Sequence, residues 1–133
     1  MTLRRHGPSL ALALAGLIAL PARADNANGG ISDGRRFDEQ GGPALYRAVC
    51  QSCHMAEGQG AQGAGRYPAL AHNPRVAAAR YVAGNVLHGR HGMPGFAAAM
   101  SDEQVAQVVN YVRTHLGNDF PDPISPAQVR ALR

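Results

Sequence analysis

The chain has 133 residues and a formal net charge of +4, and all 13 of its basic side chains are arginines. Three of these arginines lie in the first 24 residues, so the remaining ten are nearly balanced by nine acidic side chains. A balance this close to zero does not support binding to nucleic acid or anionic lipid through net charge.

The first 24 residues have the pattern of a cleaved export signal. A positive head (Arg4, Arg5, His6) precedes an apolar run at residues 10–20. Small residues (Ala22, Ala24) stand before the expected cut. The alternative is a retained membrane anchor, but a run of about 11 residues is too short for a bilayer, which needs roughly 20. No cysteine lies at the cut to carry a lipid. We therefore expect cleavage near Ala24 and Asp25 and a periplasmic product.

About 109 residues remain after such a cut, which is enough for one domain. They include seven aromatic side chains and no tryptophan, so the apolar core is expected to be thin. Small domains of this kind often depend on a cross-link, a metal or a cofactor. A bulky apolar cofactor would supply the missing core.

Residues 25–40 are rich in glycine, asparagine and aspartate and are expected to form a flexible leader. A helix is predicted to begin at Gly42, with Pro43 at its first position. Leu45, Tyr46 and Val49 then form an apolar stripe that leads into Cys50.

The middle of the chain is expected to contain a glycine-rich loop at residues 57–65 and an extended segment at 66–70, since Tyr67 precedes a proline. After Asn73 and Pro74, apolar residues keep helical spacing, with Gly84 as a weak point between two short helices (Val76, Ala79, Val82, Val86, Leu87). No alternating strand pattern is present, and the predicted fold class is all-α.

The clearest predicted helix covers residues 101–116. Ser101 and Gln104 fit a capping box, and one apolar stripe runs along the helix (Val105, Val108, Val109, Val112, Leu116). Gly117 is the expected stop. The tail that follows is predicted to end in a short helix capped by Ser125.

Both cysteines lie in the segment Cys-Gln-Ser-Cys-His at residues 50–54. A thioredoxin-like disulfide would follow a strand, whereas the approach to Cys50 is predicted to be helical. A zinc site needs four ligands, and the remaining histidines show no paired spacing. Covalent haem attachment explains the arrangement best, because two thiols on one helical turn can bond to two vinyl groups along one side of a porphyrin. His54 then projects its imidazole toward the iron.

A sixth ligand would come from one of several methionines and histidines (Met55, Met93, Met100, His72, His88, His91). Met55 is next to His54 and cannot reach the opposite face of the ring. Met100 is explained by a hydrophobic staple with Val105. Met93 lies in a loop between glycines and Pro94, where the backbone can approach a ring closely and the proline stiffens the turn. We expect Met93 to be the ligand, with the two neighbouring histidines as alternatives.

Residues 41–117 resemble the class I monohaem cytochromes c of bacteria. The resemblance rests on LYRAVCQSCH, the glycine-rich loop, YPAL, GMPGF and SDEQVAQVVNYVRTHLG. It implies one haem c bound covalently by Cys50 and Cys53, with His54 and Met93 as axial ligands.

The resemblance also implies two further features of the site. The carbonyl of Pro68 is expected to accept a hydrogen bond from the proximal imidazole, and Leu70 to line the ring. The first and last helices are expected to cross, so that the stripe before Cys50 meets the last long helix (Tyr46, Val49; Val108, Tyr111, Val112). The expected domains are a signal at 1–24, the leader at 25–40, the cytochrome c domain at 41–118 and a tail with a short helix at 119–133.

The expected function is periplasmic electron transfer without catalysis. By resemblance, the electron donor is a dehydrogenase, and the acceptor is an oxidase or another cytochrome; no nucleic acid and no stable membrane insertion are expected. The lysine ring by which some family members dock is absent, and four arginines are candidates to replace it (Arg66, Arg75, Arg80, Arg90). The alternatives are a permanent dehydrogenase subunit, and a gas-binding or catalytic haem with a displaceable sixth ligand.

Overall fold

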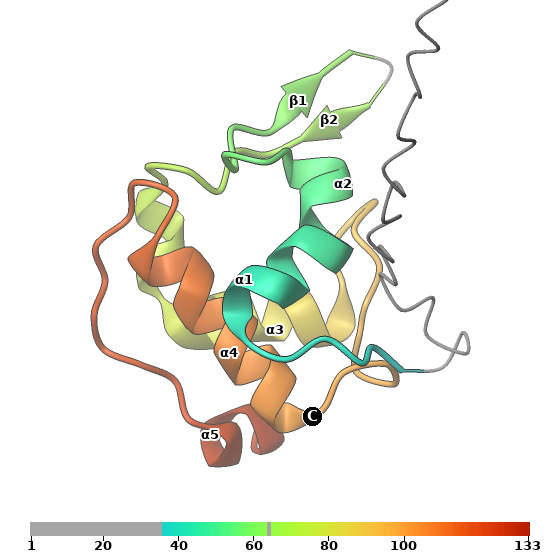
Figure 1. Cartoon of the computed structure of the whole chain (residues 1–133), viewed down its shortest axis with the longest axis vertical. Coiled ribbons are helices and arrows are strands. Elements are labelled where there is room, and N and C mark those ends of the chain that lie inside the picture. Colours follow the sequence, from blue (N-terminus) through green and yellow to red (C-terminus); the bar gives the residue numbers. More distant parts are fainter. Residues whose placement is uncertain (1–35, 64) are drawn as a thin grey trace, which may run out of the picture.

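The computed structural model describes residues 36–63 and 65–133, and this part of the chain is mainly helical (Figure 1). The expected signal and leader residues 25–35 lie outside it. In chain order the helical elements are α1 (Gly42–Leu45), the π-helical turn η1 (Tyr46–Cys50), α2 (Gln51–His54), the 3₁₀ turn η2 (Pro74–Ala77), α3 (Ala79–His88), α4 (Asp102–Thr114) and α5 (Pro126–Arg130). None of the helices in the described ranges has the length and apolar character needed to cross a membrane.

The elements α1, η1 and α2 follow one another without a break from Gly42 to His54. The predicted start is confirmed, with Pro43 in the first turn, where its missing N–H is not needed. The π turn between Tyr46 and Cys50 was not predicted. Because a π turn adds a residue to the helix, Cys50 is rotated away from the position that an uninterrupted α-helical stripe would give it.

A two-stranded antiparallel hairpin follows α2, and the all-helical prediction did not include it. Strands β1 (Ala61–Gln62) and β2 (Arg66–Tyr67) pair with Ala61 opposite Tyr67. Gly60 has a φ of 68°, and a Cβ there would lie 2.4 Å from the carbonyl oxygen of Tyr67. The glycine therefore permits the close return of the chain at the base of the hairpin.

The break predicted at Gly84 was wrong. Asn73 caps η2 by accepting a hydrogen bond from the Arg75 N–H at 3.0 Å, and the chain leaves helical geometry at Ala78. From there α3 runs through Gly84 to its end. A single interior glycine costs only about 1 kcal/mol. Burial of Val86 and Leu87 on the same helix offsets that cost.

The predicted caps of α4 and α5 are confirmed. Ser101 and Gln104 form a capping box at the start of α4, and Ser125 and Gln128 form another at α5. Helix α4 ends at Thr114, ahead of the predicted stop, although Gly117 does adopt a positive φ of 73°.

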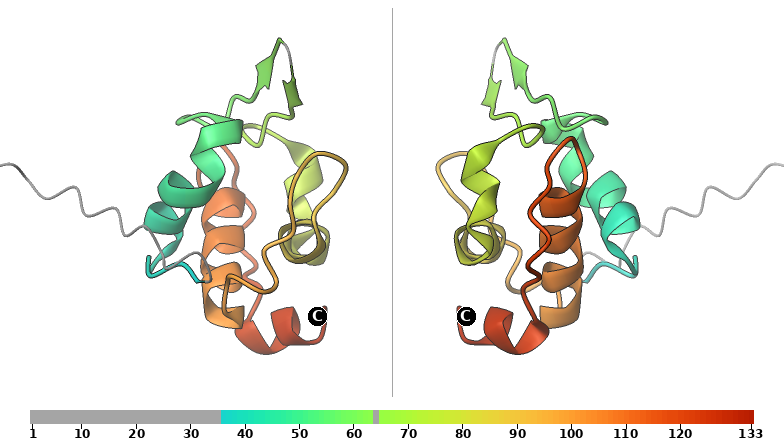
Figure 2. Two further views of the ribbon diagram at one scale, coloured as in Figure 1. Left: turned by 90° about the vertical axis from the view of Figure 1, so that its right-hand side faces the viewer. Right: turned by 90° about the vertical axis from the view of Figure 1, so that its left-hand side faces the viewer.

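Helix α4 lies between the N-terminal helical run and α3, with α5 at one end of the molecule and the hairpin at the other (Figure 2). Its crossing with α1 is close at Gly42, where a Cβ would lie 2.4 Å from Cβ of Tyr111. The rings of Tyr46 and Tyr111 are 5.6 Å apart. The expected contact between the first and last long helices is therefore present.

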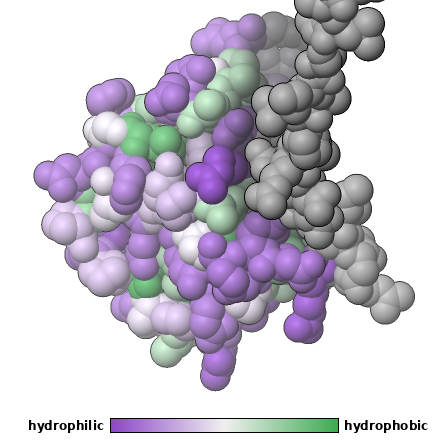
Figure 3. All heavy atoms as spheres, in the orientation of Figure 1, coloured by the Kyte–Doolittle hydropathy of each residue, from purple (hydrophilic) through white to green (hydrophobic). Residues whose placement is uncertain are grey.

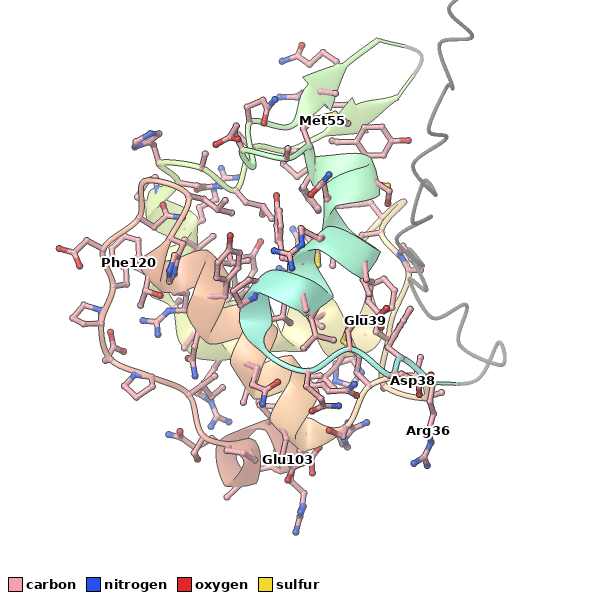
Figure 4. All side chains as sticks on the ribbon, in the orientation of Figure 1. Arg36, Asp38, Glu39, Met55, Glu103 and Phe120 are labelled. Carbon is pink, nitrogen blue, oxygen red and sulfur yellow. The ribbon has the colours of Figure 1, made fainter. Side chains whose placement is uncertain are left out.

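Residues 36–40, the end of the expected leader, pack against the segment that enters α4. The N–H of Phe37 donates to the carbonyl of Ala99 at 3.2 Å, and the rings of Phe37 and Phe96 are 6.2 Å apart. Gln104 donates to the carbonyls of Phe37 and Glu39 at 2.7 and 3.0 Å. Figure 4 shows Asp38 and Glu39 along this segment, which is thereby fixed to the domain.

Arg113 is fully buried in α4 and braces the segment before α3. Its guanidinium donates to the carbonyls of Val76 at 3.0 Å and Ala77 at 2.9 Å. It also donates to the carbonyl of Asp122 and, at 2.8 Å, to the carboxylate of that residue. One side chain thus joins α4, η2 and the tail. No sequence pattern distinguished this arginine from the exposed ones.

Candidate haem-binding site

The two thiols lie on one helical turn. Cys50 is the last residue of η1, Cys53 lies in α2, and both are half-buried and free of a disulfide. Burial, with a smaller contribution from the neighbouring Cys53, raises the pKa of the Cys50 thiol to about 12. Thiol–disulfide exchange needs a thiolate. The surroundings of Cys50 therefore do not favour the redox alternative, and the approach to it is helical, as expected.

His54 is buried at the end of α2, and its ring is held in one orientation. Its Nδ1 lies 2.9 Å from the carbonyl oxygen of Pro68, the contact that the resemblance implies. Since a carbonyl can only accept, Nδ1 carries the proton and donates. In the neutral ring the lone pair is then on Nε2, the nitrogen that remains for a metal.

The loop after His54 is closed by backbone hydrogen bonds that bring Pro68 to the ring. The carbonyl of Gly58 accepts from the N–H groups of Leu70 and Ala71 at 2.7 and 2.9 Å. The hydroxyl of Tyr46 donates to the carbonyl of Met55 at 2.8 Å. Burial is the main reason why the pKa of Tyr46 rises to about 12, so this hydroxyl stays a donor. Apart from its place in the apolar stripe, no sequence signal pointed to this role of Tyr46.

Met93 lies in the loop between α3 and α4 and is half-buried against the core. Two hydrogen bonds hold it in a tight turn, from Arg90 N–H to its carbonyl at 3.0 Å and from its N–H to the Arg90 carbonyl at 2.9 Å. Gly89 has a φ of 76°, and a Cβ there would lie 2.5 Å from the Met93 carbonyl oxygen. The turn therefore requires glycine at this position, a requirement that sequence analysis did not identify.

The other candidate ligands have different surroundings. Met100 is 3% exposed and belongs to the core, as a staple residue would. His88 donates from Nε2 to the carbonyl of Leu132 at 2.7 Å. His72 lies against Gly117, where a Cβ would be 2.1 Å from its ring. Met55 stands at the hairpin end of α2 (Figure 4). His91 is exposed, with a φ of 52°.

The donor set fits a haem c and not a zinc ion. Two thiols, one oriented imidazole and one thioether are the groups that covalent attachment and axial ligation require. Several half-buried apolar residues from the segments that carry these groups pack against the core. They supply apolar surface for a haem (Val49, Leu70, Val82, Phe96). Within the described residues, no three histidine, cysteine or acidic side chains are grouped so that they could hold a metal ion.

The face of the molecule in Figure 3 is mostly hydrophilic, and its apolar side chains form small, separate patches. Tyr67 and Tyr81 are the large apolar residues with high exposure among those described, each at 42%. Arg90 lies over the Tyr81 ring at 5.9 Å. Arginine and tyrosine thus share the surface next to the Met93 turn.

Comparison with known proteins gives one family match. Residues 38–112 match the family described as cytochrome c oxidase, cbb3-type, subunit III. The chain is 31% identical to the alcohol dehydrogenase (quinone) cytochrome c subunit of Gluconobacter oxydans (strain 621H), with 88% of this chain and 28% of the relative covered. It is 32% identical to the fructose dehydrogenase cytochrome subunit of Gluconobacter japonicus, covering 70% and 22%. It is 31% identical to the gluconate 2-dehydrogenase cytochrome c subunit of Pantoea cypripedii, covering 72% and 24%. The chain spans about a quarter of the length of these relatives.

Proposed function

Because the chain belongs to the cytochrome c family, in the group matched by the cbb3-type subunit III model, we propose that it is a periplasmic single-electron carrier with one haem c and a class I fold. It is an electron-transfer protein and not itself an enzyme. The observation that carries the proposal is the Cys-x-x-Cys-His turn, whose histidine is oriented by the Pro68 carbonyl at 2.9 Å.

Each site residue has a stated task in this proposal. Cys50 and Cys53 would hold the haem through thioether bonds, and the imidazole of His54 and the thioether of Met93 would bind its iron. Leu70 lines the ring. When bound in this way, the haem supplies an iron that takes up and gives back one electron.

The chain's own groups set the conditions for that exchange. The hydrogen bond from His54 Nδ1 to the Pro68 carbonyl fixes the imidazole plane and makes Nε2 a more basic metal ligand. The thioether of Met93 is a soft donor that would favour the reduced iron and so raise the potential. Burial of His54 at 8% exposure keeps water from this side of the site.

The proposed electron donor is a dehydrogenase, because the relatives are cytochrome subunits of alcohol, fructose and gluconate dehydrogenases. The proposed acceptor is an oxidase or another cytochrome. With the charge nearly balanced, contact is expected to depend on the apolar edge of the haem, assisted by exposed arginines (Arg66, Arg75, Arg80, Arg90). A pull-down from periplasm, followed by identification of the bound proteins, tests both partners.

The mass of the exported chain tests the proposed cofactor. We expect the wild-type mass to exceed that of the cleaved polypeptide by one haem, and the colour to remain after denaturation. The variant with Cys50→Ser and Cys53→Ser should have the polypeptide mass alone. A matched control, Ser52→Ala, changes an exposed residue between the two thiols and should keep the haem. Unmodified thiols in the exported wild type would disprove the proposal.

A second candidate function is that of a permanent subunit of a dehydrogenase complex, which the names of the relatives favour. Stable co-purification with a dehydrogenase would support it over a free carrier. A haem with a displaceable sixth ligand is the other alternative, and rapid binding of carbon monoxide by the reduced protein would favour that one.

A further inference from the structure

The loop that carries Met93 is attached to the rest of the molecule mainly at its two ends. The Phe96 and Ala97 N–H groups, which follow Met93, donate to the carbonyls of Val86 and Leu87 at 2.9 and 3.1 Å, so the loop closes onto the last turn of α3 from which it starts. Between these points the Met93 turn is held by its own hydrogen bonds with Arg90. The position of Met93 therefore depends on how firmly the ends of the loop are fixed.

The C-terminal tail contacts both ends of this loop. His88, the last residue of α3, donates from Nε2 to the carbonyl of Leu132 at 2.7 Å. Arg133 donates from Nη1 to the carbonyl of Ala97 at 2.5 Å and from Nη2 to that of Met100 at 2.8 Å. In Figure 1 and Figure 2 this end of the chain lies beside the loop that leads into α4.

The tail is itself anchored, so it can restrain the loop. Val129 of α5 is fully buried, and α5 packs against both α3 and α4. The Nε of Arg133 donates to Oδ1 of Asp102 at 2.5 Å, and the Nε of Arg130 donates to Oδ2 at 3.0 Å. A single arginine thus joins the first turn of α4 to two carbonyls of the loop.

We propose that Arg133, assisted by His88, is a positioning residue that holds the Met93 loop closed over the site. This inference rests on the proposed function, in which Met93 binds the iron. A restrained loop keeps the thioether in place at little entropic cost, whereas a loop freed at one end would open more often. The tail then regulates how readily the sixth position is vacated.

Three substitutions separate this role from a general effect on the tail. Arg133→Ala removes the contacts with the loop carbonyls and with Asp102. Arg130→Ala removes a contact with the same carboxylate from the same tail, but Arg130 has no hydrogen bond to the loop. His88→Ala removes the contact at the other end of the loop.

The first measurement is the rate at which the reduced, haem-loaded protein binds carbon monoxide, which requires Met93 to leave the iron. We expect Arg133→Ala to bind about fivefold faster, as the loss of roughly one net hydrogen bond predicts, and Arg130→Ala to stay within about twofold of wild type. His88→Ala should accelerate binding in the same direction. Equal rates in Arg133→Ala and Arg130→Ala would overturn the inference.

The second measurement is hydrogen exchange at the amides of Met93, Phe96 and Ala97. It does not depend on the haem. We expect faster exchange in Arg133→Ala than in Arg130→Ala, and equal exchange would count against the inference. If the wild type carries no haem, the proposed function fails, while the exchange comparison still decides whether Arg133 holds the loop.

Discussion

The two sides of the site are built in different ways. We call residues 42–71 the histidine side and residues 72–101 the methionine side. His54 lies at the end of a continuous helical run that crosses α4, and the Pro68 carbonyl orients its ring. Met93 lies in a loop whose ends are held by α3, Phe37 and Arg133. The proposed ligand His54 is therefore held by its own helix, whereas the proposed ligand Met93 depends on contacts with distant parts of the chain.

This difference predicts unequal consequences when each ligand is removed. His54 is next to Cys53, a proposed point of covalent attachment, so it is held close to the haem. Met93 lies on a loop, which can move away while the rest of the fold stays intact. The contrast can be tested first at the ligands and then at the contacts that support each side.

Replacement of the two proposed ligands should have the largest effect. We expect His54→Ala to reduce the yield of haem-loaded protein by more than the roughly 10- to 100-fold typical of losing an outer-shell partner. Met93→Ala should keep the covalent haem and lose the weak deep-red iron–sulfur band. Absorbance spectra and masses of the exported chains measure both. An unchanged spectrum in Met93→Ala would reject Met93 as a ligand, and equal haem loss in both variants would reject the contrast.

Replacement of the buried Arg113, which holds η2 and the tail against α4, should destabilise the methionine side strongly. Arg113→Met leaves the carbonyls of Val76, Ala77 and Asp122 without their donor, and the free energy of unfolding should fall by about 3 kcal/mol. Urea denaturation of the haem-loaded protein measures this. Arg75→Met is the matched control, because Arg75 is exposed, and a change within about 0.5 kcal/mol is expected. Similar losses of unfolding free energy in both variants would show that the hydrogen bonds of Arg113 do not hold these segments together.

The sequence predicted the histidine side and the caps better than the methionine side. The Cys-x-x-Cys-His turn and the caps of α4 and α5 follow from local spacing. The crossing of the first and last helices was implied by the family resemblance, and the two apolar stripes agree with it. The identity of Arg113 and Arg133 as supports does not, because an arginine in a sequence shows neither its burial nor its partner. The hairpin was missed because two-residue strands carry no alternation, and the break at Ala78 because alanine carries no turn signal.

The same glycine substitution should act in opposite directions on the two sides. At Gly42, where α1 crosses α4, a Cβ would lie 2.4 Å from Tyr111 Cβ and 2.6 Å from the Gln107 carbonyl oxygen. Gly42→Ala should therefore lower the free energy of unfolding by about 2 kcal/mol. At Gly84 of α3, nothing apart from the adjoining helix backbone lies within 4 Å of the position that a methyl group would take, and Gly84→Ala should raise stability by up to about 1 kcal/mol. Thermal melts compare the two, and a stabilising Gly42→Ala would contradict the close crossing.

The smallest expected effect is a pH dependence at the end of the Met93 loop. Hydrogen bonds from Arg133 and Arg130 hold the pKa of Asp102 below its ordinary value of 3.8. The folded protein therefore favours the ionised carboxylate, so its contribution to stability is complete above that ordinary value and is lost as the pH falls through the lower folded pKa. Asp102→Asn should lower the melting temperature at pH 6, and its difference from wild type should shrink as the pH falls below about 3.8.

Glu103→Gln is the control for this prediction. Glu103 lies in the same first turn of α4, beside α5 in Figure 4. Unlike Asp102, it forms no salt bridge with Arg130 or Arg133. A difference that is constant with pH would mean that the carboxylate charge does not hold this end of the loop.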